Sequence, residues 1–79
     1  MAKIDKLSIE VEVGARICFL RKEKGMSQEE LGFEAEVNKN YISDIERGTR
    51  NPTLKVLGKI ANGLGITLEE LFKGIGLNK

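Results

Sequence analysis

The chain contains no histidine, no tryptophan and a single cysteine, Cys18. Zinc sites use several Cys and His ligands, so this composition argues against a structural or catalytic zinc. A lone cysteine cannot form an intrachain disulfide and suits a reducing cytoplasm. The sequence also lacks a Cys/His or Ser/His pair for nucleophilic catalysis and a glycine loop that would cradle phosphate. We therefore expect a protein that is not an enzyme and uses no cofactor.

No apolar run approaches membrane-spanning length, and the N-terminus lacks the apolar core of a signal peptide. We expect a cytoplasmic protein without a membrane partner. The 79 residues are 41% hydrophobic, which fits one small domain over residues 1–79. Such a domain leaves no room for a second unit that binds a small-molecule ligand. Its stability margin is small, so dimerisation would help.

The formal net charge is only +1, but the charges are unevenly distributed. Residues 25–37 carry four glutamates and no base, whereas residues 38–59 carry five bases and two acids. A local basic segment of this kind makes a phosphate-binding footprint even when the overall charge is low. The pattern predicts modest non-specific affinity for nucleic acid.

Helix caps followed by apolar residues at a 3.6-residue period predict an all-α fold of five helices. The first helix covers about residues 9–24, although the alternation Ile9-Glu-Val11-Glu-Val13 also allows a short strand. The start and stop signals are Gly25 after the first helix, Ser27 with Glu30 at the second, Asn38 and Gly48 around the third, Thr53 and Gly65 around the fourth, and Thr67 with Glu70 at the fifth.

Residues 27–48 have the layout of a helix-turn-helix, which places its second helix in the DNA major groove. Ile42 and Ile45 would hold that helix against the core. Its outer face supplies donors and acceptors suited to base edges. The candidate base-reading residues are Lys39, Asn40, Ser43 and Asp44. Asp44 would repel phosphate, so it either reads a cytosine or pairs with a neighbour such as Lys39 or Arg47.

Polar and basic side chains around this helix are candidates for phosphate contact. These residues are Gln28, Asn38, Tyr41, Arg47, Thr49, Arg50 and Asn51. An ordinary solvated face is the alternative for Lys39, Asn40 and Arg50, and packing at the domain edge is the alternative for Tyr41. Glu46 is expected to be structural and to pair with Arg47, Arg50 or an amide.

The runs Gly25-Met-Ser-Gln-Glu-Glu-Leu31 and Tyr41-Ile-Ser-Asp-Ile-Glu-Arg-Gly48, followed by Pro52-Thr-Leu54, resemble the phage-repressor/Cro-type (xenobiotic-response-element) helix-turn-helix family. The resemblance covers about residues 13–72. It implies a lambda-repressor-like domain that binds a pseudo-palindromic operator as a homodimer. It also implies a dimerisation region at about residues 64–79, with Leu68, Leu71, Phe72 and Ile75 at the interface.

Within the family, the run from Asn40 to Asn51 is similar to controller proteins of restriction–modification systems. Lys39 and Asn40 depart from the Arg and Thr often found there, which leaves the operator sequence open. Two further residues depart from the family pattern. Gly32 lies inside the second helix and should lower the stability of that helix by about 1 kcal/mol. Phe19 lies on the first helix. Phe19 is expected to pack on the N-terminal segment that includes Ile4, Leu7, Ile9 and Val11, or on the partner.

The sequence therefore predicts a homodimeric, sequence-specific transcriptional regulator that binds double-stranded operator DNA. RNA polymerase is a further candidate partner, through Glu29, Glu30 and Glu34. The alternatives are a phage-type repressor, an antitoxin, and a helix-turn-helix module that binds proteins.

Overall fold

The computed structural model describes residues 8–76, and these residues form five helices and no strand. The helices are α1 (Ile9–Glu23), α2 (Gln28–Ala35), α3 (Lys39–Glu46), α4 (Leu54–Leu64) and α5 (Leu68–Leu71). The predicted all-α class and helix count are thus confirmed. Helix α1 begins at Ile9, so the alternative of a strand there was wrong. None of the helices in this part of the chain is long and apolar enough to cross a membrane.

The predicted caps explain where α2, α3, α4 and α5 start. Ser27 and Glu30 form a complete capping box, in which each side chain accepts a hydrogen bond from the other residue's backbone N–H. At α3 the Asn38 side chain accepts from the Asn40 N–H, and at α4 the Thr53 hydroxyl accepts from the Val56 N–H. At α5 the Thr67 hydroxyl accepts from the Glu70 N–H. These contacts satisfy backbone donors that the first turn of a helix leaves unpaired.

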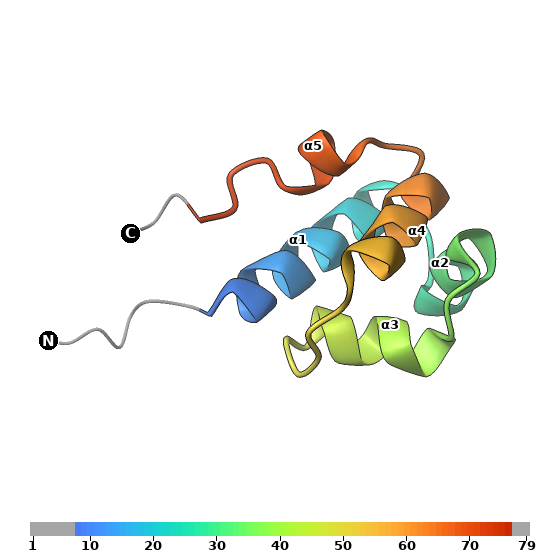
Figure 1. Cartoon of the computed structure of the whole chain (residues 1–79). Coiled ribbons are helices and arrows are strands. Elements are labelled where there is room, and N and C mark those ends of the chain that lie inside the picture. The colour runs from blue at the N-terminus through green and yellow to red at the C-terminus, as the bar shows by residue number, and fades with distance from the viewer. Residues whose placement is uncertain (1–7, 77–79) are drawn as a thin grey trace, which may run out of the picture.

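The core lies between α1, α2, α3 and α4, and α5 closes one end (Figure 1). Helix α2 packs on α4, and α3 crosses below α1 and α4 in this view. Six large side chains are almost completely buried and come from all five helices: Ile17, Leu31, Ile42, Ile45, Ile60 and Leu71. The apolar spacing within each helix therefore converges on one shared interior.

Close backbone approaches explain two of the glycines. A Cβ added at Gly14 on α1 would lie 2.1 Å from the Ile45 carbonyl oxygen, so only glycine lets α1 cross α3 at this point. A Cβ at Gly32 on α2 would lie 2.6 Å from the Val37 carbonyl oxygen in the turn that follows. Gly32 therefore has a packing role that offsets its poor helix propensity.

Candidate nucleic-acid interface

Helix α3 is buried on one side and exposed at its start. Ile42 and Ile45 are 0% and 1% exposed and fix the helix against the core. Lys39 and Asn40 occupy the first two positions and are exposed to solvent. The Asn38 side chain accepts from the Asn40 N–H at 2.7 Å and so caps the helix. The first turn of α3 thus presents solvent-exposed polar side chains on a helix whose opposite face is buried.

The turn between α2 and α3 is set by a residue in the left-handed conformation. Glu36 has φ 58° and ψ 43°, a region that favours glycine and is strained for other residues. Its backbone allows the Val37 N–H to donate to the Gly32 carbonyl at 2.9 Å. Val37 then turns inward and packs against the core. These contacts set the direction in which α3 leaves α2.

A buried ion pair joins α1 to the end of α3. The Arg21 guanidinium donates to both carboxylate oxygens of Glu46, from Nε at 2.7 Å and from Nη2 at 3.0 Å. Its Nη1 donates to the Met26 carbonyl, and the Gln28 side-chain amide donates to Glu46 at 3.0 Å. The two charged side chains are only 11% and 5% exposed. The ion pair at the centre of this network is therefore buried, and the network links α1, α2 and α3.

The same contacts shift the acid–base equilibria. Burial alone would raise the pKa of Glu46, but hydrogen bonds from Arg21 and Gln28, with the positive charge of Arg21, outweigh burial and lower the pKa below its ordinary value. The hydrogen bond to Glu46 likewise raises the pKa of Arg21, against the opposing effect of burial. Both groups are charged at neutral pH.

The sequence did not predict Arg21 as a partner of Glu46, and it predicted only one of the contacts that Glu46 makes. Glu46 was expected to pair with Arg47, Arg50 or an amide, and of these only the amide, from Gln28, contacts it. Arg47 and Arg50 pair with Asp44. The available signal was position: Arg21 follows Val13 and Ile17 at four-residue steps and so lies on the buried face of α1.

A second polar cluster lies on the outer side of α3. Arg47 donates to the carboxylate of Asp44 and, from Nη1, to the Ser43 hydroxyl at 2.8 Å. Arg50 Nη1 lies 3.6 Å from the other carboxylate oxygen of Asp44, and its guanidinium lies over the Tyr41 ring, 4.5 Å from the centroid. The structure thus brings together Tyr41, Ser43, Asp44, Arg47 and Arg50, all predicted site residues.

The remaining predicted residues lie in the loop after α3 and at the start of α2. Thr49 donates to the Asp44 carbonyl from its backbone N–H at 3.1 Å and from its hydroxyl at 3.0 Å. Gln28 begins α2 beside Glu46 and is half-buried. Asn51 is exposed in the loop after α3, where it borders an apolar cavity. Among the described residues, no group of three or more acidic, Cys or His side chains is arranged to hold a metal ion.

The predicted dimer residues fall into two groups. Leu71 is 0% exposed and belongs to the core, so its assignment to the interface was wrong. The error arose because one apolar face of α5 was read as an interface, whereas Leu71 closes the end of the core. Leu68 is 37% exposed. Phe72 and Ile75 are half-buried and line an apolar cavity of about 340 Å³.

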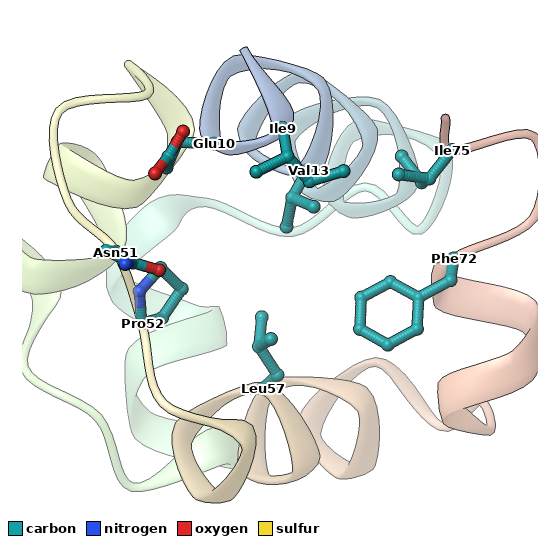
Figure 2. Close-up of a pocket in the computed structure, with 8 residues that line it drawn as sticks. All are labelled: Ile9, Glu10, Val13, Asn51, Pro52, Leu57, Phe72 and Ile75. Carbon is teal, nitrogen blue, oxygen red and sulfur yellow. The ribbon is translucent and has the colours of Figure 1, made fainter. Parts of the chain in front are cut away.

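This cavity lies between the start of α1, the α3–α4 loop, α4 and the C-terminal segment. Figure 2 shows Leu57 pointing into it from α4 at the bottom, Phe72 pointing into it from the right, and Ile9, Val13 and Ile75 along the upper border. Pro52 and Asn51 form the wall nearest α3. The cavity is therefore lined mainly by apolar side chains and reaches the loop that follows α3.

Two polar residues of α1 hold the C-terminal wall of the cavity in place. Arg16 donates to the Glu70 and Leu71 carbonyls at 2.8 and 3.2 Å, and Glu12 accepts from the Gly76 N–H at 2.8 Å. The Arg16 guanidinium also lies over the Phe19 ring, which is 54% exposed. Of the segment on which Phe19 was predicted to pack, Ile4 and Leu7 lie outside the described residues, and Ile9 and Val11 belong to α1 together with Phe19.

The comparisons with known proteins agree with this geometry. A family profile described as helix-turn-helix matches residues 19–71. The control protein C.MunI from Mycoplasma sp is 46% identical over 68 residues, which cover 85% of this chain and 92% of that protein.

Solved structures give the same result. The restriction-modification controller C.AhdI from Aeromonas hydrophila superposes with a TM-score of 0.78 at 41% identity, covering 80% of this chain and 96% of that one. C.Esp1396I bound to a 19 base pair DNA duplex superposes with a TM-score of 0.81 at 36% identity, covering 87% and 92%. The chain therefore belongs to the helix-turn-helix family, and within it resembles the controller proteins of restriction–modification systems.

Proposed function

We propose that this protein is a sequence-specific, DNA-binding transcriptional regulator that acts as a homodimer on a pseudo-palindromic operator, as a restriction–modification controller would. The observation that carries the proposal is the presentation of α3. Its back is fixed by Ile42 and Ile45, and its start exposes Lys39 and Asn40. Lys donates to guanine and Asn pairs with adenine in the major groove. The proposal involves no catalysis and places the protein with the DNA in the cytoplasm.

The basic side chains around α3 support DNA as the partner. Arg47 and Arg50 are both exposed and lie on the same side as Ser43 and Tyr41. Arginine in this setting binds phosphate and fixes the register of a helix in the groove. The solved structure of C.Esp1396I with a DNA duplex, which shares this fold, supports the same assignment.

The apolar cavity supports a homodimer. Its lining joins Phe72 and Ile75 to the loop residues Asn51 and Pro52 directly after α3. The proposed occupant of this cavity is a second copy of the chain, with Leu68, which is 37% exposed on α5, as a further contact. Two-fold dimers of this kind bind half-sites about 34–36 Å apart, which is one turn of DNA.

Salt dependence tests the DNA-binding part of the proposal. Affinity for a duplex that carries the selected site should fall by about a thousandfold or more between about 50 and 200 mM salt, because several phosphate contacts release counterions. The paired substitution Lys39→Ala/Asn40→Ala should weaken binding to that site, while Lys59→Ala removes the same charge from the exposed face of α4 and serves as the control. Weak binding with little salt dependence would contradict the proposal.

Sedimentation analysis tests the dimer. Leu68→Glu introduces a charge at a residue that is 37% exposed in the single chain and should weaken dimerisation by about tenfold or more. Phe33→Glu changes an α2 side chain that is 81% exposed and should leave dimerisation unchanged. Equal dimer dissociation constants for the two variants would exclude Leu68 from the interface.

A second candidate function is protein binding, and the outer face of α2 favours it. Phe33 is 81% exposed and borders Ser27, Glu29, Glu30 and Glu34. Large exposed apolar side chains surrounded by charge are typical of contact surfaces. RNA polymerase is the partner that an activator would contact here. Loss of transcriptional activation in Phe33→Ser, with operator binding retained, would support this second function.

A further inference from the structure

We propose that Asp44 is a positioning residue that holds Arg47 and Arg50 ready for phosphate contact and does not itself read a base. This inference rests on the proposed DNA-binding function and assigns a role at the same site. It also revises the expectation from sequence, which placed Asp44 among the base-reading residues.

Both oxygens of the Asp44 carboxylate already face an arginine. Arg47 Nη2 donates to Oδ1, and Arg50 Nη1 lies 3.6 Å from Oδ2. The Asp44 side chain is only 29% exposed, so its neighbours cover much of its surface. A cytosine amino group would have to reach the small exposed part of this carboxylate and compete there with two charged partners.

The arginines keep donors for DNA while they contact Asp44. An arginine has five N–H donors, and Arg47 uses two of its nitrogens on Asp44 and Ser43. Arg50 is held by the ion pair with Asp44 and by the Tyr41 ring, 4.5 Å from its guanidinium. The Arg47 and Arg50 side chains are 60% and 52% exposed, so their remaining donors are open to a phosphate.

The main chain of Asp44 fixes the loop that carries Arg50. The Asp44 carbonyl accepts from both the backbone N–H and the hydroxyl of Thr49, at 3.1 and 3.0 Å. These two hydrogen bonds place residue 50 back over the side of α3. Asp44 therefore contacts the basic loop through its backbone as well as its side chain.

The charge of the cluster also fits a phosphate partner. Asp44 carries one negative charge and the two arginines carry two positive charges. A phosphate that approaches the cluster meets a net positive group, and the repulsion expected from an isolated aspartate is neutralised. An ordered side chain also loses less conformational entropy when it binds, which favours affinity.

The inference is tested first in the DNA-free protein. Nitrogen-15 relaxation of the arginine Nε groups should show that Asp44→Ala makes Arg47 and Arg50 more mobile, whereas Lys39→Ala leaves them unchanged. Circular dichroism checks that both variants are folded. Unchanged mobility of the two arginines in Asp44→Ala would overturn the positioning role.

DNA binding then separates positioning from base reading. Asp44→Ala is compared with wild type, and again in a background that carries Arg47→Ala and Arg50→Ala. We expect the selected DNA sequence to stay unchanged in Asp44→Ala and the affinity to fall by about two- to tenfold, as ordering of the arginines is lost. Without the arginines the same substitution should raise affinity, because an unpaired carboxylate near phosphate is removed.

Two results would overturn the inference. One is a relaxed preference at a single base pair in Asp44→Ala, by about fivefold or more, as Lys39→Ala should show for its own base. The other is the same fold-change for Asp44→Ala with and without the arginines. If the wild-type protein selects no sequence at all, the proposed function itself fails and this inference falls with it. The relaxation data distinguish that case, since they report the ordering of the arginines without DNA.

Discussion

The Arg21 guanidinium on α1 contacts both carboxylate oxygens of Glu46 in the last turn of α3, 25 positions further along the sequence. Glu46 also accepts from Gln28 at the start of α2. The pair therefore fixes both helices of the helix-turn-helix relative to α1. Removal of either partner would leave a buried charge without compensation.

We predict that Arg21→Ala lowers the free energy of unfolding by about 3–5 kcal/mol. Arg47 gives a matched control. Its side chain is 60% exposed in the ion pair with Asp44, so Arg47→Ala should cost at most about 1 kcal/mol of stability. Urea denaturation of both variants measures the difference. Similar losses in the free energy of unfolding for the two substitutions would contradict the larger contribution that we assign to the buried Arg21–Glu46 pair.

Acid should weaken the domain through Glu46. Its pKa is lower in the folded protein than in the unfolded chain, so its contribution to stability is present above the unfolded pKa of about 4.3 and is lost as pH falls through the folded value. We predict that the free energy of unfolding of wild type declines below about pH 5. Glu46→Gln should be less stable at pH 7 and decline less steeply. If the free energy of unfolding changed with pH in the same way for both proteins, Glu46 would not be the source of the acid sensitivity.

Gly32→Ala should destabilise the protein by about 1–3 kcal/mol, although alanine is the better helix former. The added Cβ would lie 2.6 Å from the Val37 carbonyl oxygen, which is part of the turn and cannot move away easily. Gly58 on α4 is the control, because a Cβ there meets nothing within 4 Å. Gly58→Ala should stabilise by about 0.5–1 kcal/mol. If both substitutions stabilised the protein, the close approach of Gly32 to the Val37 carbonyl oxygen would be refuted.

Glu36→Gly should stabilise the domain by about 1 kcal/mol, because it relieves the left-handed backbone at φ 58°. A gain of this size raises the melting temperature by roughly 4–8 °C in a domain of this length. Glu34→Gly, inside α2, should instead lose about 1 kcal/mol. A lower melting temperature for Glu36→Gly would show that the turn is not strained at this position.

The helices were predictable from the sequence, because a helix cap and an apolar period each depend on residues that are close together in the chain. Ser27 with Glu30, Asn38 and Thr53 cap the helices as expected. The Arg21–Glu46 pair was not predicted, since periodicity identifies a buried face but does not say which distant side chain neutralises a charge on it. Leu71 was misassigned for a related reason: an apolar residue suits a core and an interface equally well.

The candidate site was predictable as a set of residues but not as a set of contacts. Lys39 and Asn40 are exposed at the start of α3, as base readers must be. Asp44 was left open between reading cytosine and pairing with Lys39 or Arg47, and the structure pairs it with Arg47 and also with Arg50. Arg50 was missed as a partner because the loop after α3 brings it back over the helix, and that path depends on Thr49.

The most direct test is selection of bound duplexes from a random DNA library at near-physiological salt, with wild type and Lys39→Ala/Asn40→Ala. The account predicts enrichment of a two-fold-symmetric site in the wild type, with half-sites spaced by about one helical turn. In the double variant the preference should be lost or relaxed at the positions that Lys39 and Asn40 contact. No enriched sequence with the wild-type protein, or the same site with both proteins, would contradict the claim that α3 reads DNA through these residues.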